Sequence, residues 1–358
     1  MNNETRKETQ VLPKDVRYVG ADDLTLPLFE NQYPVQPMGV SYNSYLILDE
    51  KIAVMDSVDA RAADEWLAKL AHELDGRSPD YLVISHMEPD HSGSILRLAE
   101  KYQEMKLVGN TKTFTMLRQF FGAKAPTDDR LLEVGEGETL PLGAHTLHFM
   151  LAPMVHWPEV MVAYEETEKL LFSADAFGRF GSLGRTANAP WAPQARRYYY
   201  NIVGKYGAQV QALLKKASAL EIKTVCPLHG PVLTGEALGE ALRLYDLWSR
   251  WQSESPDDIL LAHASIHGNT ARAAELLKQK LEAKGARVTL CDLTTTEVSY
   301  AVANAFYCGK LVLACSTYDG GLFPPMEEFL SHLQAKGFRS RTLPHKHKVP
   351  SDFRVPFP

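Results

Sequence analysis

The segment that most constrains the fold of this chain is His86–His91, with the sequence His-Met-Glu-Pro-Asp-His, directly after the apolar run Tyr81–Ile84. Four of its six side chains are good metal ligands. A loop at the end of a buried strand is where α/β folds place their chemistry. Because imidazole alternates with carboxylate here, the pattern suits two adjacent cations. The segment therefore predicts half of a two-metal site at the edge of a sheet.

Three further loops each place one candidate ligand after an apolar, strand-like run. They carry His156 in Ala152–Glu159, Asp175 in Phe172–Gly178 and His229 in Cys226–Pro231. A lone His or Asp in a loop is usually a cap or a solvated turn residue, but loops that end neighbouring strands can meet at one edge. Seven candidate metal ligands result: His86, Glu88, Asp90, His91, His156, Asp175 and His229.

The first 252 residues are rich in predicted strands. These strands lie at Tyr42–Leu48, Ala53–Met55, Thr146–Met150, Val160–Tyr164 and Leu170–Ser173, and helical patterns occur at Ala60–Leu74 and Ile95–Lys101. A short polar break follows at Ser253–Asp257. We therefore expect a first domain at residues 1–252.

After the break, apolar strands alternate with helices. The strands are predicted at Ile259–Ala262, Arg287–Leu290 and Leu311–Ala314, and the helices at Thr270–Lys284, Val298–Asn304 and Met326–Lys336. This alternation is typical of a doubly wound parallel sheet, which normally has five strands. Residues 343–358 have neither period and contain several prolines, so we expect a partial domain at 258–342 and an irregular tail at 343–358.

Composition excludes several classes of protein. The 358 residues, 45% of them hydrophobic, are enough for two domains with sizeable cores. A formal charge of −6 argues against a nucleic-acid partner. The polar start and the lack of a run of about 18 apolar residues predict a cytoplasmic protein without a membrane span. The four cysteines form no Cys-x-x-Cys pair, so we expect reduced thiols in the core and neither a zinc ribbon nor a rubredoxin-type iron centre.

The motifs together resemble those of a known family. The chain is similar to the flavodiiron proteins in four motifs, which occur in this order: His-x-Glu-x-Asp-His, Pro-Met-x-His-Trp-Pro, Ser-Ala-Asp-Ala-Phe-Gly and His-Gly-Pro. The resemblance runs from about Tyr18 to Thr342. It implies a metallo-β-lactamase-like αββα sandwich followed by a flavodoxin-like doubly wound parallel sheet, here incomplete at its C-terminal end. Glu88 stands where zinc hydrolases of this fold carry His, and a harder oxygen ligand moves the preference from zinc toward iron.

The resemblance also implies a division of the ligands. One iron is expected at His86, Glu88 and His156, the other at Asp90, His91 and His229, and Asp175 is expected to bridge them. Tyr198–Tyr200 match the place of an aromatic lid near the pocket, or are tyrosines that an amphipathic helix packs into the core.

Two loops of the second domain suggest a flavin site. Ser265–Thr270 lies between a strand and a helix, where hydroxyls, backbone N–H groups and a helix start can hold a phosphate, and it resembles the phosphate loop of flavodoxins. Ser316–Gly321 resembles the family's second flavin loop. The candidate FMN residues are Ser265, Ile266, His267, Gly268, Asn269, Thr270, Ser316, Thr317, Tyr318, Asp319, Gly320 and Gly321. The family continues with two more strands and a third flavin loop, so we expect FMN binding to be weak or absent.

The activity implied by the resemblance is reduction of O2 to water, of NO to N2O, or of both. Electrons would come from a rubredoxin or a similar small carrier through FMN, in a head-to-tail homodimer or a dimer of dimers. Two alternatives remain open on the residues: a dinuclear zinc hydrolase, and a metal-binding remnant without electron input.

Overall fold

The computed structural model describes residues 11–340, and the tail predicted at 343–358 lies outside the described residues. The chain divides into two compact units. The first unit contains the described residues up to Tyr199 together with Ala208–Tyr245. The second contains Tyr200–Gly207 and the described residues from Asp246 on.

Two six-stranded sheets form the first unit. In spatial order, one sheet contains β1 (Val16–Tyr18), β6 (Tyr45–Ile47), β7 (Ala53–Met55), β8 (Tyr81–Val83), β9 (Lys106–Gly109) and β10 (Leu131–Glu133). The other contains β11 (Thr139–Pro141), β12 (Thr146–Leu151), β13 (Met161–Glu165), β14 (Leu170–Phe172), β15 (Thr224–Cys226) and β16 (Leu233–Thr234). Two small hairpin-like pairs accompany them, β2 (Ala21–Asp23) with β5 (Val40–Tyr42) and β3 (Leu28–Phe29) with β4 (Tyr33–Pro34).

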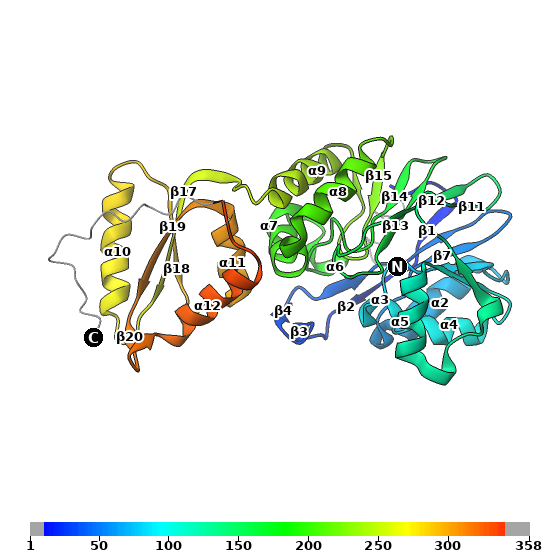
Figure 1. Cartoon of the computed structure of the whole chain (residues 1–358), viewed down its shortest axis with the longest axis horizontal. Helices are drawn as coiled ribbons and strands as arrows, with labels where there is room; N and C mark the ends of the chain where they lie inside the picture. Colours follow the sequence, from blue (N-terminus) through cyan, green and yellow to red (C-terminus); the bar gives the residue numbers. More distant parts are fainter. Residues whose placement is uncertain (1–10, 341–358) are drawn as a thin grey trace. The chain divides into compact units, whose positions relative to one another are not determined.

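The core of this unit lies between the two sheets. Alternate residues of the first sheet, such as Met55 and Val83, belong to one buried cluster with Phe149, Ala163 and Phe172 of the second sheet. Alternation of this kind is the period-2 pattern of strands that face a core. The outer faces are covered by helices (Figure 1), which makes the unit an αββα sandwich as predicted.

The helices of the first unit fall into two sets. The first set is α2 (Ala63–Leu74), α3 (Pro89–Ser92), α4 (Ile95–Lys101) and α5 (Thr111–Phe121). The second set is α6 (Leu183–Thr186), α7 (Trp191–Tyr198), α8 (Gly207–Ala217) and α9 (Gly235–Ser249). Helix α2 shows how a helix is held on the sheet, because Trp66 and Leu70 lie one turn apart on one face and are fully buried.

One predicted strand is wrong in its extent. Tyr42–Leu48 was expected to be a single strand, but β5 ends at Tyr42 and β6 begins at Tyr45. The break has a physical cause, because the Asn43 amide donates hydrogen bonds to the carbonyl oxygens of Pro227 and Gly230, at 2.8 and 2.7 Å. The backbone N–H of Asn43 also donates to the Leu228 carbonyl oxygen at 2.8 Å, so it is not available to the ladder of either strand.

The second unit is a parallel sheet with the order β18-β17-β19. Its strands are β17 (Ser255–Ala264), β18 (Val288–Asp292) and β19 (Cys308–Cys315), its helices are α10 (Asn269–Glu282), α11 (Val298–Tyr307) and α12 (Pro324–Ala335), and β20 (Thr317–Tyr318) pairs with β21 (Gly321–Leu322). This order is that of the first three strands of a flavodoxin-like sheet, as predicted. The polar break was predicted too long, since Ser255 already pairs with Cys308.

Two expectations from composition concern membrane spans and cysteines. Among residues 11–340, none of the helices combines the length and the apolar character that a membrane crossing needs. The four cysteines, all among the described residues, form no disulfide, and Cys226, Cys291 and Cys308 are buried.

Candidate metal centre

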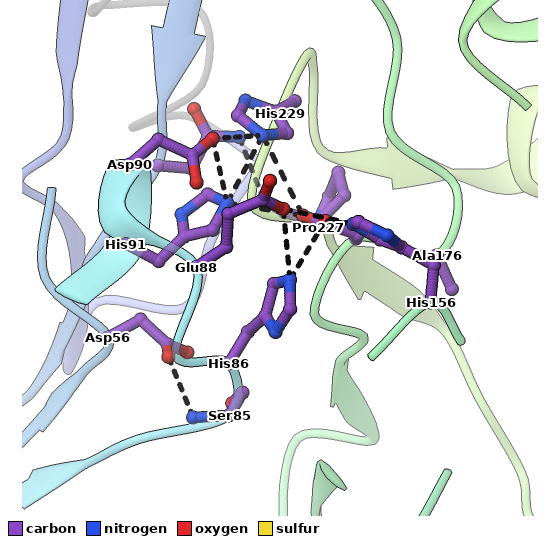
Figure 2. A network of polar contacts seen from close by, with 12 residues as sticks. Asp56, Ser85, His86, Glu88, Asp90, His91, His156, Ala176, Pro227 and His229 are labelled. Carbon is purple, nitrogen blue, oxygen red and sulfur yellow. Dashed lines mark hydrogen bonds and ion pairs between the residues drawn. The ribbon is translucent and has the colours of Figure 1, made fainter. Parts of the chain in front are cut away.

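The seven predicted ligands come from four loops that meet at one edge of the sandwich. His86 follows β8, Glu88 precedes α3, and Asp90 and His91 lie within α3. The remaining three, His156, Asp175 and His229, follow β12, β14 and β15. Figure 2 shows the labelled imidazoles and carboxylates of these loops pointing toward one another. The structure therefore brings together all seven residues that the sequence singled out.

Four of the ligands form the first group, His86, Glu88, His156 and Asp175. His156 Nε2 lies 3.0 Å from Glu88 Oε2 and 3.0 Å from Asp175 Oδ2. His86 Nε2 lies 3.3 Å from Glu88 Oε2 and 3.5 Å from Asp175 Oδ2. Four donor atoms thus surround one small volume.

The second group contains Asp90, His91 and His229. Nε2 of His91 and Nε2 of His229 are 3.1 Å apart, and Asp90 Oδ2 lies 3.3 and 3.1 Å from them. Asp175 Oδ1 lies 3.2 Å from His91 Nε2 and 3.7 Å from His229 Nε2. Since its other oxygen faces the first group, the Asp175 carboxylate stands between the two groups.

The spacing of the donor atoms fits bound cations. Ligand atoms about 2.1 Å from one ion, at tetrahedral or octahedral angles, are roughly 3.0–3.4 Å from one another. Most of the distances above lie in or close to that range. In addition, both Asp90 oxygens and Asp175 Oδ1 are buried without a hydrogen-bond partner among the described residues. Buried carboxylate oxygens rarely lack a hydrogen-bond partner, and bound cations would take the place of that partner here.

A buried carboxylate that was not predicted as a site residue orients His86. Glu159 Oε1 accepts a hydrogen bond from His86 Nδ1 at 2.7 Å and another from the backbone N–H of Met87 at 2.8 Å. With Nδ1 as the donor, Nε2 presents its lone pair to the first group. Carboxylate–histidine pairs of this kind fix the tautomer and the ring of a metal-binding histidine.

Two polar residues, Ser41 within β5 and Asn43 directly after it, hold His229 and its loop. The carbonyl oxygen of Ser41 accepts a hydrogen bond from His229 Nδ1 at 2.7 Å, and the Ser41 hydroxyl accepts one from the backbone N–H of Gly230 at 2.8 Å. Asn43 holds the same loop through the carbonyl oxygens described above. The interrupted strand is therefore part of the site, and its sequence signal was only a polar Ser-x-Asn-Ser run inside an apolar segment.

Another buried carboxylate holds the start of the His86 loop. Asp56 accepts a hydrogen bond from the backbone N–H of Ser85 at 2.7 Å (Figure 2). Burial raises the pKa of Asp56 to about 6, although Ser85 and His91 partly offset this rise. A neighbouring cation would favour the charged form of this carboxylate.

The site combines carboxylates and histidines whose charges stabilise one another. Burial alone would raise the pKa values of Glu88 and Asp175, but contacts with the histidines lower both. Burial alone would likewise lower the pKa of His156, but hydrogen bonds to Asp175 and Glu88 raise it to about 9. Without cations, the cluster therefore holds protons on its histidines.

A cavity of roughly 610 Å³ opens next to the two groups. Glu88 and Asp90 lie in its wall, together with Glu30, Phe29 and Trp157. The cavity gives a small molecule a way to reach the ligand groups.

The first of the three consecutive tyrosines lies beside a histidine of the second group. The Tyr198 ring is 5.5 Å from the His229 ring, and its buried hydroxyl has no hydrogen-bond partner among the described residues. Tyr199 packs on Tyr245, with ring centroids 5.0 Å apart. Tyr200 stacks on Phe306 at 3.9 Å within the second unit. The packing interpretation thus holds for two of the tyrosines.

The two predicted flavin loops lie together at the carboxyl ends of β17 and β19. The Thr270 and Ser316 hydroxyls, one from each loop, are 2.9 Å apart, and the backbone N–H of Ile266 donates to Ser316 Oγ at 3.4 Å. Ser265 Oγ is buried without a partner among the described residues, next to the start of α10. An unsatisfied hydroxyl beside a helix start fits a phosphate group.

The two sheets and the paired ligand groups define a metallo-β-lactamase-type domain with a candidate two-metal site, joined in one chain to a parallel α/β domain. Residues 40–230, more than half of the chain, match a family model described as ODP family beta lactamase. The chain belongs to the flavodiiron protein family.

Curated relatives and solved structures agree with this assignment. A rubredoxin-oxygen oxidoreductase of Megalodesulfovibrio gigas is 29% identical over 335 residues, which cover 90% of this chain and 80% of that protein. An anaerobic nitric oxide reductase flavorubredoxin of Vibrio vulnificus is 27% identical over 340 residues, which cover 91% and 67%. The crystal structure of the flavodiiron protein from Giardia intestinalis aligns with a TM-score of 0.85 at 28% identity, covering 91% of this chain and 79% of that one.

Proposed function

We propose that this protein is an oxidoreductase that reduces O2 to water, NO to N2O, or both, at a non-haem diiron centre. The observation that carries the proposal is the pair of ligand groups that share Asp175, with Glu88 rather than a histidine in the first group. The relatives named above are O2 and NO reductases by name, which supports the same activity here. The hydrolase alternative is not favoured by Glu88 or by these relatives.

The donor set suits iron. Glu88, Asp90 and Asp175 supply three negative charges, so two ferrous ions would leave a net charge of about +1, which one hydroxide would neutralise. We assign His86, Glu88 and His156 to one iron and Asp90, His91 and His229 to the other, with Asp175 as the bridge. When bound, two ferrous ions supply electrons to a small substrate.

The protein's own residues prepare the site for that substrate. Glu159 and Ser41 hold His86 and His229 with Nε2 directed into the centre. Phe29 and Trp157 give the cavity apolar walls, which suit uncharged diatomic molecules. Burial raises the pKa of the Tyr198 phenol well above its ordinary value, so the hydroxyl keeps its proton and can donate it in a hydrogen bond.

We also propose that the Ser265–Thr270 and Ser316–Gly321 loops bind FMN, and that a rubredoxin or a similar carrier supplies the electrons. The unsatisfied Ser265 hydroxyl and the Thr270–Ser316 contact support a phosphate site there. Four expectations stay predictions: weak or absent FMN binding, the head-to-tail dimer, the domain boundaries 1–252 and 258–342, and the cytoplasmic location.

Metal and flavin content of anaerobically purified protein tests the proposal. We expect about two irons per chain by elemental analysis, and consumption of O2 or NO when a reduced rubredoxin is added. Two zincs together with hydrolysis of chromogenic esters would refute the proposal. Turnover with a chemical reductant but none with any protein donor would instead support the remnant alternative.

A further inference from the structure

The cavity beside the metal groups is too large to select a diatomic molecule by its volume. At roughly 610 Å³, it falls among pockets of about 300–1,000 Å³, which bury drug-sized ligands. Because O2 and NO have only two heavy atoms, the cavity would admit much bulkier molecules as well. Any selection by size must therefore take place between the cavity and the ligand groups.

The histidines of both groups lie behind the cavity wall. Glu88 and Asp90 are the candidate ligands that line the cavity. His86, His156 and His229 are all buried. The side chains between the cavity and these imidazoles therefore control how closely a molecule can approach the two groups.

Trp157 stands beside the first group. It lines the cavity, and its ring packs edge-on against His86, with ring centroids 5.3 Å apart and an interplanar angle of 89°. The same ring lies 6.3 Å from that of His156. Its backbone is held in place, because the Trp157 carbonyl oxygen accepts hydrogen bonds from the N–H groups of Met154 at 2.7 Å and Val160 at 3.4 Å. The indole therefore separates the cavity from two histidines of this group.

Phe29 stands beside the second group. It also lines the cavity, and its ring packs edge-on against His229, with ring centroids 5.3 Å apart. Phe180 contacts the other side of this environment, with its ring 5.6 Å from that of Phe29. Phe29 is 3% exposed, and β3 pairs it with Tyr33 of β4. Since side chains in a close-packed interior have little room to turn, the phenyl ring keeps its place beside His229.

We propose that Trp157 and Phe29 are specificity-determining residues, which limit the molecules that reach the first and the second ligand group to about the size of a diatomic. The inference rests on the proposed function, since it requires metals in both groups. It goes further by assigning one aromatic side chain to each group. Bulkier molecules, such as the ester substrates of a hydrolase, would enter the cavity but would not reach the metals.

Binding of alkyl isocyanides to the iron-loaded protein tests the proposal. These compounds bind ferrous iron through a terminal carbon atom, and their substituents can be chosen by bulk. Anaerobic titration with methyl and with tert-butyl isocyanide is followed by the infrared C≡N stretching band of the bound molecule. A misfit of one methylene in an apolar pocket changes binding about 10- to 200-fold. We therefore expect the unchanged protein to bind methyl isocyanide about tenfold or more tightly than the tert-butyl compound.

Truncation of either ring should remove the selection at one iron. Trp157→Ala and Phe29→Ala should each raise the affinity for tert-butyl isocyanide by about tenfold or more at one iron of the pair. The double variant should do so at both irons. Affinity for methyl isocyanide should stay unchanged in all three, because that molecule already fits. Trp157→Phe and Phe29→Leu remove less of each ring and should give smaller gains in the same direction.

Trp66→Ala is the control for a merely structural effect. Trp66 is fully buried on α2, outside the cavity wall and both ligand groups. This variant should unfold at a lower temperature but keep the size dependence of the unchanged protein. Elemental analysis of every variant confirms that two irons are bound. If an alanine variant at Trp157 or Phe29 loses iron, Trp157→Phe or Phe29→Leu takes its place.

The possible results are distinct. Equal binding of the two isocyanides by the unchanged protein would overturn the inference, as would unchanged binding of the tert-butyl compound in the variants at Trp157 and Phe29. A similar gain in Trp66→Ala would overturn it as well, because that pattern indicates general loosening of the fold. Failure of the unchanged protein to bind two Fe²⁺ ions would instead refute the proposed function.

Discussion

Replacement of Glu159 by glutamine should weaken one metal site selectively. The glutamine keeps a carbonyl oxygen for His86 Nδ1 and for the Met87 N–H, but it loses the negative charge that makes both hydrogen bonds strong. A hydrogen bond to a charged group contributes about 1.5–3 kcal/mol and a neutral one about 0.5–1.5 kcal/mol. The difference between the midpoints of these ranges is about 1.25 kcal/mol for His86, which corresponds to roughly an eightfold loss of affinity.

The same substitution should also lower the free energy of unfolding. Glu159 Oε2 is buried, without a hydrogen-bond partner among the described residues, so the new amide nitrogen would be an unsatisfied donor there. Such a donor costs about 1–3 kcal/mol. Chelator competition measures the affinities of the two metal sites. Chemical denaturation of metal-free protein measures the change in the free energy of unfolding.

Glu165→Gln provides a matched control. Glu165 is also fully buried, accepts hydrogen bonds from the backbone N–H groups of Thr167 and Glu168 at 2.8 and 2.7 Å, and lies 3.0 Å from His145 Nδ1. It belongs to neither ligand group, so stability should fall while both affinities stay unchanged. The argument about Glu159 fails if Glu159→Gln leaves both affinities unchanged, or lowers them equally.

Three further predictions concern the bridge, the pH dependence and the second unit. Asp175→Ala should remove both metals and His229→Ala only one, as elemental analysis would show; equal losses contradict the bridging role. Because the pKa of His156 is raised to about 9, its stabilising contribution, up to roughly 3 kcal/mol, is complete below pH 6.5 and is lost as the pH rises through 9. Thermal unfolding of metal-free protein should follow this trend, and His156→Gln should flatten it. Phe306→Ala removes the ring stacked on Tyr200 and should destabilise the second unit by about 3–5 kcal/mol in denaturant unfolding without changing the iron content.

The candidate metal ligands could be predicted from the sequence because their signal is local. Four of them lie within the six residues His86–His91, and the other three follow apolar runs that do form strands. The end of each strand is fixed by its own residues, and strand ends of neighbouring strands share an edge. The parallel sheet of the second unit was also predictable from a local signal, the alternation of apolar strands with helices.

The residues that support the ligands were not predictable in this way. Glu159 is 73 residues away from His86, and Ser41 is 188 residues away from His229. None of these pairs has a period or a spacing that a sequence pattern could show.

The sequence alone thus predicted the candidate metal ligands and the loops that carry them, because these depend on residue type. Local periodicity predicted the parallel sheet of the second unit, whereas the αββα sandwich was implied by the resemblance of the motifs to the flavodiiron family. The tertiary structure alone decided which buried groups orient the candidate ligands, such as Glu159 for His86 and Ser41 for His229. The break at Asn43 also depends on the tertiary structure. The sequence pattern predicts one continuous strand there, and the break results from contacts of Asn43 with the loop that carries His229. Contacts of this kind depend on how two sheets stack, and the stacking is a property of the whole chain.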